Sequence, residues 1–307
     1  MRPLSPVSSA ATVPSRGLWL GLLGVGIFAL TLPMTRLATG TPAAPQLSGL
    51  FIATGRAVVA AVLSALFLLA LRAPLPQRRD WPVLAMVALG VVFGFPICTS
   101  VAMRHVEAVH ASVILGVLPL ATAAVGALLQ RQRPSAGFWL CAAGGAALVV
   151  AYALLRSGQA LGLHWADALL LLGMVCAAVG YGYGARLSQE LGAERVICWA
   201  LLLSLPLTLP LTLWSWPAAT VTPLAWGGFA YVAVFSMWLG FFAWYRGLAL
   251  GGTVRVSQLQ LLQPFLSMLA AVPVLGESLD ALTLGFALAV IAIVFTGRKM
   301  PIHATRP

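Results

Sequence analysis

Long apolar stretches, separated by short polar connections, follow one another along almost the whole chain. About 20 consecutive apolar residues are enough for a helix to cross the hydrocarbon core of a membrane. Stretches of that kind lie at 17–36, 49–71, 81–102, 109–129, 136–155, 167–187, 196–216, 224–248, 254–275 and 281–297. The pattern predicts an all-α polytopic membrane protein with ten transmembrane helices.

The ninth stretch, Thr253–Leu275, is unusual because polar residues and a proline interrupt it. The polar residues that share one side at helical spacing are Ser257, Gln260, Gln263 and Ser267. Pro264 has no amide hydrogen, so the carbonyl of Gln260 is expected to lose its helical partner. Polar groups at membrane depth indicate a pathway or a binding site. The alternative is a kinked helix whose glutamines bond neighbouring helices.

Composition excludes a soluble domain. Hydrophobic residues make up 61% of the 307 and charged residues only 8%, whereas soluble proteins carry about 25% charged residues. The net charge of +11 does not indicate a nucleic-acid partner, because the basic residues are scattered in the short connections and form no patch. The expected partners are membrane lipid and a small-molecule substrate.

The positions of the basic residues predict the orientation. If the amino terminus is cytoplasmic, 14 of the 18 Lys and Arg residues lie in inside segments, 3 lie outside, and Arg56 lies within a helix. Such an excess is typical of cytoplasmic loops. We therefore expect a multi-pass protein of the cytoplasmic (inner) membrane with both termini cytoplasmic. Residues 1–16 are expected to form a disordered tail and residues 299–307 a second tail.

The two halves of the chain resemble each other weakly. When Pro119 is placed over Pro264, three further pairs match: Ser112 with Ser257, Leu120 with Phe265, and Thr122 with Ser267. The alignment predicts two five-helix repeats, 17–156 and 167–298. Because each has an odd number of helices, the two would be inserted in opposite directions, as in many secondary transporters.

Features spread over nearly the whole chain resemble the EamA-type ten-span exporters of the drug/metabolite transporter superfamily. They are Gly55-Arg56-Ala57, the stretch Arg104–Leu118 that ends at Pro119, Leu259–Pro264, and Leu275-Gly276-Glu277. The resemblance implies a secondary active transporter that exports small metabolites or amino-acid-like compounds by alternating access. It also implies a substrate site between the repeats, beside the interrupted fourth and ninth helices.

Two departures from that pattern concern ionisable residues. The first half has Gln130-Arg131-Gln132-Arg133 where the second half has Glu277, and no carboxylate lies in the middle of a predicted helix. The small multidrug pumps, which look like distant relatives, use a buried glutamate, so coupling of that type is not expected. His110 is a candidate proton carrier, with a purely structural histidine as the alternative.

Arg56 is the most informative single residue. Placing Arg at a helix centre costs about 2.5–3.5 kcal/mol on insertion scales, so such residues are usually functional. One interpretation is an anchor for an anionic substrate group in a central cavity. The other is a structural or gating arginine that bonds carbonyl groups or reaches outward.

Aromatic residues of the eighth stretch complete the predicted site. Trp238, Phe241, Phe242 and Tyr245 share one face by spacing and can line a cavity or form an interfacial belt. The residues that we assign to the substrate cavity are Arg56, Phe95, Ser112, Pro119, Tyr181, Trp238, Tyr245, Ser257, Gln260, Gln263, Pro264 and Ser267.

Other classes of function are less compatible with the chain. It contains no His-Glu-x-x-His or Gly-x-Ser-x-Gly motif and no paired intramembrane acids, so we expect no enzyme, no cofactor and no metal. A passive channel or facilitator is the alternative to a secondary transporter. The sequence identifies neither the substrate nor the oligomeric state, and a homodimer is compatible with it.

Overall fold

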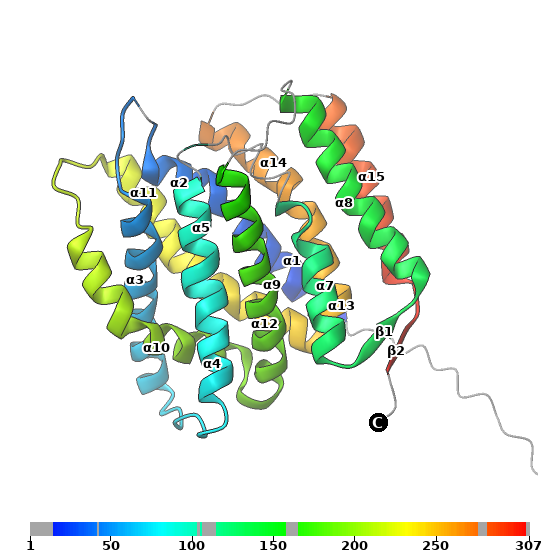
Figure 1. Cartoon of the computed structure of the whole chain (residues 1–307), viewed down its shortest axis with the longest axis horizontal. Coiled ribbons are helices and arrows are strands. Elements are labelled where there is room, and N and C mark those ends of the chain that lie inside the picture. Colours follow the sequence, from blue (N-terminus) through cyan, green and yellow to red (C-terminus); the bar gives the residue numbers. More distant parts are fainter. Residues whose placement is uncertain are drawn as a thin grey trace, which may run out of the picture.

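The chain folds into a bundle of helices (Figure 1). The computed structural model describes residues 15–41, 43–102, 105, 115–157, 165–275 and 281–304. The helices are α1 (Ser15–Ala29), α2 (Thr31–Thr39), α3 (Gly49–Ala70), α4 (Trp81–Val87), the π-helix η1 (Ala88–Gly94), α5 (Phe95–Ala102), α7 (Leu118–Leu129), α8 (Ala136–Ser157), α9 (Trp165–Leu191), α10 (Ala193–Trp214), α11 (Pro223–Tyr231), the π-helix η2 (Val232–Leu239), α12 (Gly240–Gly251), α13 (Thr253–Val256), the 3₁₀-helix η3 (Ser257–Leu262), α14 (Gln263–Leu275) and α15 (Ala281–Arg298). Two short strands, β1 (Gln132–Pro134) and β2 (Ile302–Ala304), pair antiparallel.

Six helical stretches in the described residues are long and apolar enough to cross a membrane: Ser15–Thr39, Gly49–Ala70, Trp81–Ala102, Trp165–Leu191, Ala193–Trp214 and Pro223–Gly251. Shorter apolar helices cover Leu118–Leu129, Ala136–Tyr152 and Leu284–Gly297. The prediction of an all-α polytopic membrane protein is therefore confirmed, and the full set of ten crossings stays a prediction.

Local sequence signals explain where several helices begin and end. Ser48 caps α3 by accepting a hydrogen bond from the Phe51 amide at 3.0 Å, a role that serine oxygens favour. Thr222 does the same for α11, which then starts with Pro223. Gly192 separates α9 from α10 with a φ of 89°, a backbone conformation that glycine adopts readily.

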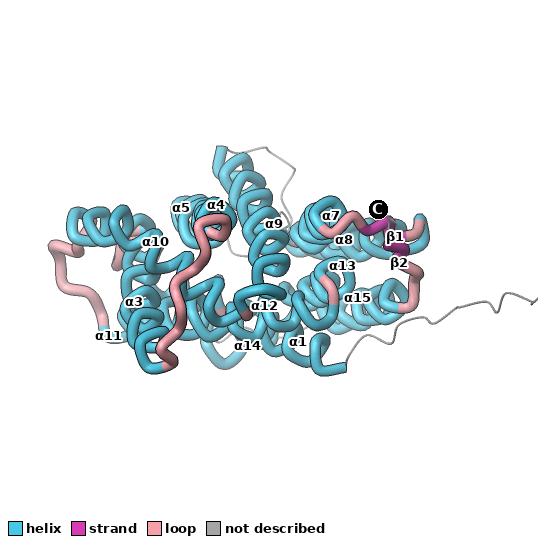
Figure 2. Tube along the Cα trace, turned by 90° about the horizontal axis from the view of Figure 1, so that it is seen from below, coloured by secondary structure: helices cyan, strands magenta, loops and turns pink. Residues whose placement is uncertain are grey.

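The closest helix pairs join the two halves of the chain. Pairs of this kind include α3 with α10, α8 with α15, α1 with α12, α2 with α11, α9 with α5 and η1, α7 with α9, and α1 with α14. Figure 1 shows that α3 and α10 run in opposite directions, as do α8 and α15. Seen from below in Figure 2, α4, α5, α9 and α7 lie along one side of the bundle, and α11, α12, α14 and α1 lie along the other.

Glycines allow these helices to touch through their backbones. A Cβ atom on Gly247 of α12 would lie 2.6 Å from the Gly21 nitrogen of α1. A Cβ atom on Gly90 of η1 would lie 2.8 Å from the Gly180 Cα of α9. Contacts this short are possible only without a side chain, and small residues are the usual means of close approach between membrane helices.

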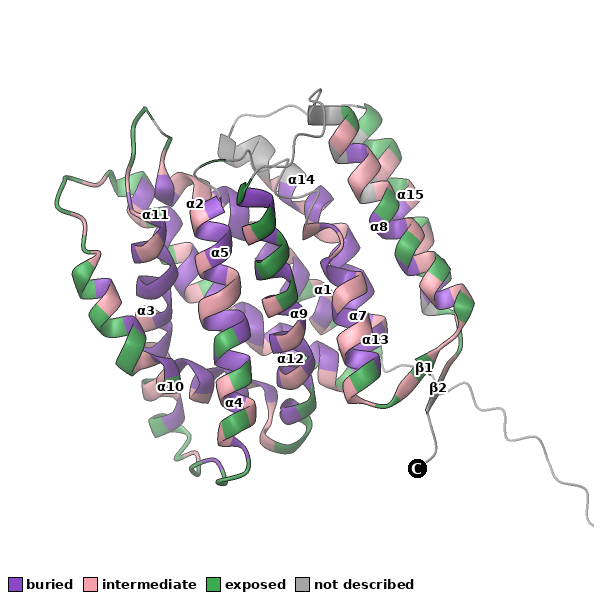
Figure 3. Cartoon of the chain, in the orientation of Figure 1, coloured by how far each residue is buried: buried purple, intermediate pink, exposed green. Residues whose placement is uncertain are grey.

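The outer surface is apolar, as a lipid-facing surface must be. Leu69, Leu128 and Trp214 are 73%, 79% and 80% exposed, and Figure 3 shows buried residues gathered on the inward sides of the helices. An apolar surface of this extent would mark an aggregation site on a soluble monomer. The exposed apolar surface is therefore suited to contact with the hydrocarbon core of a membrane.

The close approach of α1 and α12 generates a stability prediction. Gly247→Ala should lower the unfolding free energy by about 1–3 kcal/mol, the usual cost of overpacking, because the added methyl group meets the α1 backbone. Gly227→Ala in the same membrane stretch is the matched control, since a Cβ there meets no atom within 4 Å. Thermal unfolding in detergent measures both, and an equal loss in the two variants would contradict this account of the packing.

Candidate functional site

A cavity lies between the two halves of the chain, and both halves contribute to its lining. The residues that line it are Phe28, Thr31, Leu32, Arg56, Val91, Phe95, Leu115, Leu118, Tyr181, Ser236, Phe241, Gln260, Gln263, Pro264 and Ser267. The space open to the centres of water-sized molecules is about 50 Å³. Because one water needs about 10–15 Å³ of such space, the cavity is narrow but has room for water around its polar groups.

Interrupted helices supply most of the lining. The α1–α2 break at Leu30, the π-helices η1 and η2, and the 3₁₀-helix η3 each contribute residues to it. In η1 the Phe95 amide bonds the Gly90 carbonyl, and in η2 the Gly240 amide bonds the Phe235 carbonyl. These i→i−5 bonds form π-bulges, which occur frequently at functional sites.

The proline of the ninth stretch changes the winding of the helix without leaving a carbonyl unbonded. The Gln263 amide donates to the Gln260 carbonyl, which replaces the bond that Pro264 cannot make. The sequence-based expectation of an unpartnered Gln260 carbonyl was therefore wrong, because a 3₁₀ turn joins residues three apart instead of four. The unbonded groups are instead in the Gln260 side chain.

Arg56 supplies the charge of the cavity. Its side chain is 4% exposed, and its guanidinium donates to the Ser236 hydroxyl of η2 at 3.2 Å. Ser236 in turn shares a hydrogen bond of 2.8 Å with the Thr31 hydroxyl of α2. The Nε atom of Arg56 has no partner among the described residues. Arg56 is also the single charged side chain in the described lining.

The Gln260 amide faces the same cavity. Gln260 is 3% exposed, and neither its nitrogen nor its oxygen has a hydrogen-bond partner in the described part of the chain. The nearest polar side chain is Tyr181 of α9, which approaches Gln260 without completing a hydrogen bond of normal geometry and interacts electrostatically with Arg56. A buried polar group without a partner costs about 1–3 kcal/mol, so these groups are poised for a ligand or for water.

Aromatic residues close the bundle below the cavity. Because α12 runs downward in Figure 1, Trp244 and Tyr245 lie below Phe241, and both are fully buried. The rings of Tyr181 and Trp244 are 5.5 Å apart, and those of Phe241 and Tyr245 are 5.3 Å apart. The Tyr245 hydroxyl donates to the Gly180 carbonyl at 3.2 Å. This packed layer separates the cavity from the lower end of the bundle.

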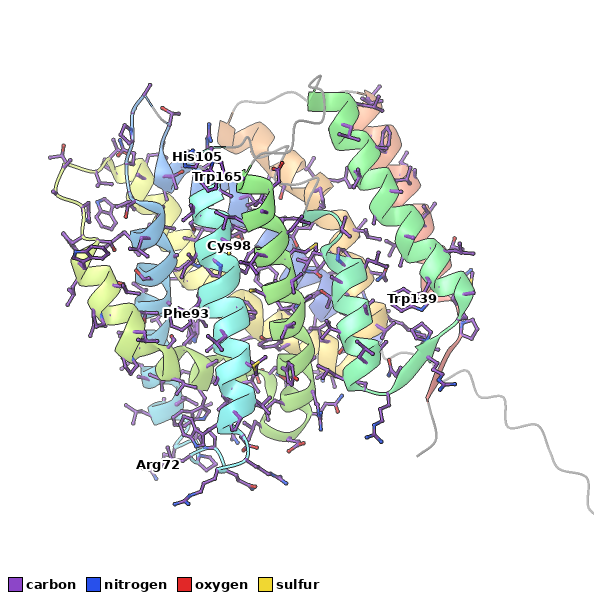
Figure 4. The ribbon with its side chains drawn as sticks, viewed as in Figure 1. Arg72, Phe93, Cys98, His105, Trp139 and Trp165 are labelled. Carbon is purple, nitrogen blue, oxygen red and sulfur yellow. The ribbon has the colours of Figure 1, made fainter. Side chains whose placement is uncertain are left out.

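The two ends of the bundle differ in character. Figure 4 shows Arg72 at the lower end and His105 beside Trp165 at the upper end, where their rings lie 4.7 Å apart. Arg56 lies in the upper half of α3, which begins at Gly49, so the cavity is nearer the upper end. Two ion pairs, Arg79–Glu190 and Arg246–Glu194, lie at the lower end.

The structure brings together seven of the residues that the sequence assigned to the cavity: Arg56, Phe95, Tyr181, Gln260, Gln263, Pro264 and Ser267. Pro119, Trp238, Tyr245 and Ser257 lie outside the described lining. The Pro119 carbonyl accepts from Gln258 at 3.5 Å, and Ser257 donates to the Val254 carbonyl. Trp238 packs on Phe67 with the rings 6.0 Å apart. Ser112 and His110 lie outside the described residues.

Sequence reasoning missed Thr31 and Ser236. Each is a polar residue within an apolar stretch and shows no periodic pattern. Ser236 lies inside the π-helix η2, whose winding no helical spacing rule anticipates. The signal that could have found them is their polarity at membrane depth, which marks candidates for a site.

The fold and this cavity define the chain as a polytopic membrane protein of the transporter class. The EamA-like transporter family model matches residues 15–155 and again 164–298, so the chain belongs to that family. It is 44% identical over 286 residues to the uncharacterized transporter YdeK of Bacillus subtilis (strain 168), a match covering 92% of this chain and 96% of that protein. A crystal structure of a protein 19% identical shares the fold, with a TM-score of 0.70 over 92% of this chain and 95% of the other.

Gln260→Leu is expected to raise the melting temperature of the protein. Leucine removes a donor and an acceptor that are buried without partners, and with them a desolvation cost of about 1–3 kcal/mol. Gln258→Leu is the matched control and should lower the melting temperature, because it removes the bond to Pro119. Thermal unfolding in nanodiscs compares the two, and equal losses would show that the Gln260 amide is bonded in the folded protein.

Proposed function

We propose that the protein is a secondary active transporter that moves small metabolites or amino-acid-like compounds outward across the cytoplasmic membrane by alternating access. The observation that carries the proposal is the cavity between the two halves. It contains the guanidinium of Arg56 from the regular helix α3 and the unbonded amide of Gln260 from the interrupted ninth stretch. A substrate site at such a position, formed by discontinuous helices, is typical of secondary transporters.

The proposal includes two inverted repeats of five helices, 17–156 and 167–298. The family model matches the chain twice, at nearly those boundaries. The alignment that places Pro119 over Pro264 also places the π-helix η1 (Ala88–Gly94) over residues 233–239, which nearly coincide with η2 (Val232–Leu239). Two π-helices at equivalent positions are difficult to explain without a common origin of the halves.

The helix contacts support the same repeats. If each helix is replaced by its equivalent in the other half, the pair α1–α12 becomes the pair of α9 with α5 and η1. In the same way, the pair α7–α9 becomes the pair α1–α14. All of these pairs occur in the structure. The remaining close pairs, α3–α10 and α8–α15, join equivalent helices that run in opposite directions (Figure 1). Contacts of this kind are expected of a two-fold axis lying in the membrane plane.

The charges support the orientation. Exposed basic residues gather in the connections at the lower end, among them Arg72, Arg79, Arg133 and Lys299, and basic connections face the cytoplasm. Ser15 and the strand β2 lie near the same end, so both termini would be cytoplasmic. The packed aromatic layer then closes the cytoplasmic side of the cavity in the described conformation.

The function is tested by comparing the metabolites in the medium of expressing and non-expressing cells. Expressing cells should enrich the medium in a small set of compounds. Arg56→Ala should abolish the enrichment, and Arg56→Lys should keep part of it, because lysine retains the charge but not the planar fork of donors. Arg72→Ala is the matched control, since Arg72 lies exposed at the lower end.

Enrichment that persists in Arg56→Ala at normal protein levels would remove the cavity from the transport path. Unitary currents of the purified protein in a planar bilayer would show that the protein is a channel and not a carrier. A carrier needs a conformational change for each transport cycle. Its turnover is therefore too slow to produce the current steps of a single open channel.

A further inference from the structure

We propose that the cavity binds an apolar monocarboxylate, with its carboxylate on Arg56 and its hydrocarbon part against the aromatic wall. The inference concerns the ligand of the site. That this ligand is also transported rests on the function proposed above.

The charge of the cavity indicates an anion. Arg56 is nine-tenths or more buried, and the described lining contains no carboxylate to neutralise it. Its Nε atom has no described partner, and its one hydrogen bond within the described part of the chain goes to the neutral hydroxyl of Ser236. A buried charge without a counter-ion is costly, and a carboxylate that accepts two parallel hydrogen bonds from a guanidinium is the group that relieves this cost best.

The single charged side chain of the described lining indicates a ligand with one negative charge. Besides Arg56, the side chains of the described lining that can donate to an oxygen anion include the Gln260 and Gln263 amides and the Ser236 and Tyr181 hydroxyls. All are neutral. A phosphate carries up to two charges and more acceptor oxygens at neutral pH, and this lining supplies only one positive charge. A carboxylate, with one negative charge, matches the single positive charge of this lining.

The remaining lining indicates an apolar body. The cavity residues without a polar side-chain atom include Phe28, Leu32, Val91, Phe95, Leu115, Leu118 and Phe241. An ammonium group placed among them would find no described carboxylate, and the amide acceptors in the described lining are the neutral oxygens of Gln260 and Gln263. The site therefore recognises the carboxyl end of a ligand and gains little from an amino group.

A set of four probes with related skeletons separates these features. They are 4-methylpentanoate, leucine, 3-methylbutylamine and 4-methylpentanamide: the acid, the amino acid, the amine and the neutral amide. Radiolabelled 4-methylpentanoate is bound to the purified protein in nanodiscs, and the other three compete with it. We expect the amine and the amide to compete about tenfold or more weakly than the unlabelled acid, because each loses the charge-assisted bonds to Arg56. Leucine should compete no better than the acid.

Variants assign the binding to the cavity. Arg56→Gln should weaken the binding of the acid about tenfold or more, and Arg56→Lys by less. Ser236→Ala is compared with Ser64→Ala, a second buried serine that lies on α3 outside the described lining; only Ser236→Ala should change the affinity. If Arg56→Gln does not fold, the four probes on the wild-type protein still decide the class of ligand.

The outcomes separate this inference from the proposed function. The inference would be overturned by a preference for the amine or by equal competition from the amide. It would also be overturned if the acid did not bind, or if folded Arg56→Gln bound the acid with unchanged affinity. Arg56-dependent binding of the acid without counterflow in proteoliposomes would support the inference and contradict transport of this ligand. Counterflow of the amine that does not depend on Arg56 would show that the protein is a transporter and would overturn the inference about its ligand.

Discussion

The rest of this structure depends on the need to bond every backbone polar group inside a hydrocarbon medium. Irregular backbone is tolerated at membrane depth only where protein or a water-filled cavity satisfies it. Among the described residues, the break at Leu30, the two π-helices and the 3₁₀ turn before Pro264 all contribute to the lining of one cavity. The regular helices α3 and α9 add one side chain each, Arg56 and Tyr181. The places where the helices are least regular are thus the places where the protein presents its polar groups.

Stability and function make opposite demands on this cavity. Arg56 and Gln260 are buried without enough partners, which costs folding free energy, and the bundle offsets that cost through apolar packing and close glycine contacts. These groups lie in a narrow polar cavity, and the packed layer of Trp244 and Tyr245 closes one side of it. Alternating access would require that layer to separate while a corresponding seal forms above, and the reciprocal helix contacts offer two equivalent arrangements for doing so.

Several parts of this account could be predicted from the sequence, for identifiable reasons. Membrane helices and the charge asymmetry follow from long apolar runs and scattered basic residues. Gln260, Gln263, Pro264 and Ser267 were found because polar residues recur on one side of a single stretch. Ser257 was grouped with them by α-helical spacing, whereas the η3 segment has about three residues per turn. Trp238 and Tyr245 were assigned to the cavity by the same spacing, although the η2 segment has a different winding. Thr31 and Ser236 show no periodicity, and only the packing of distant helices brings them to Arg56.

Hydrogen–deuterium exchange in nanodiscs tests the central claim most directly, because it reports whether the interrupted helices line a wet chamber. The account predicts that amides in Val232–Leu239 and Ser257–Leu262 exchange about tenfold or more faster than those in residues 57–70 of α3, since water reaches irregular backbone and local opening costs less there. Equal, strong protection of all three segments would mean that the interruptions are dry and packed, and would contradict a water-filled cavity between the two halves.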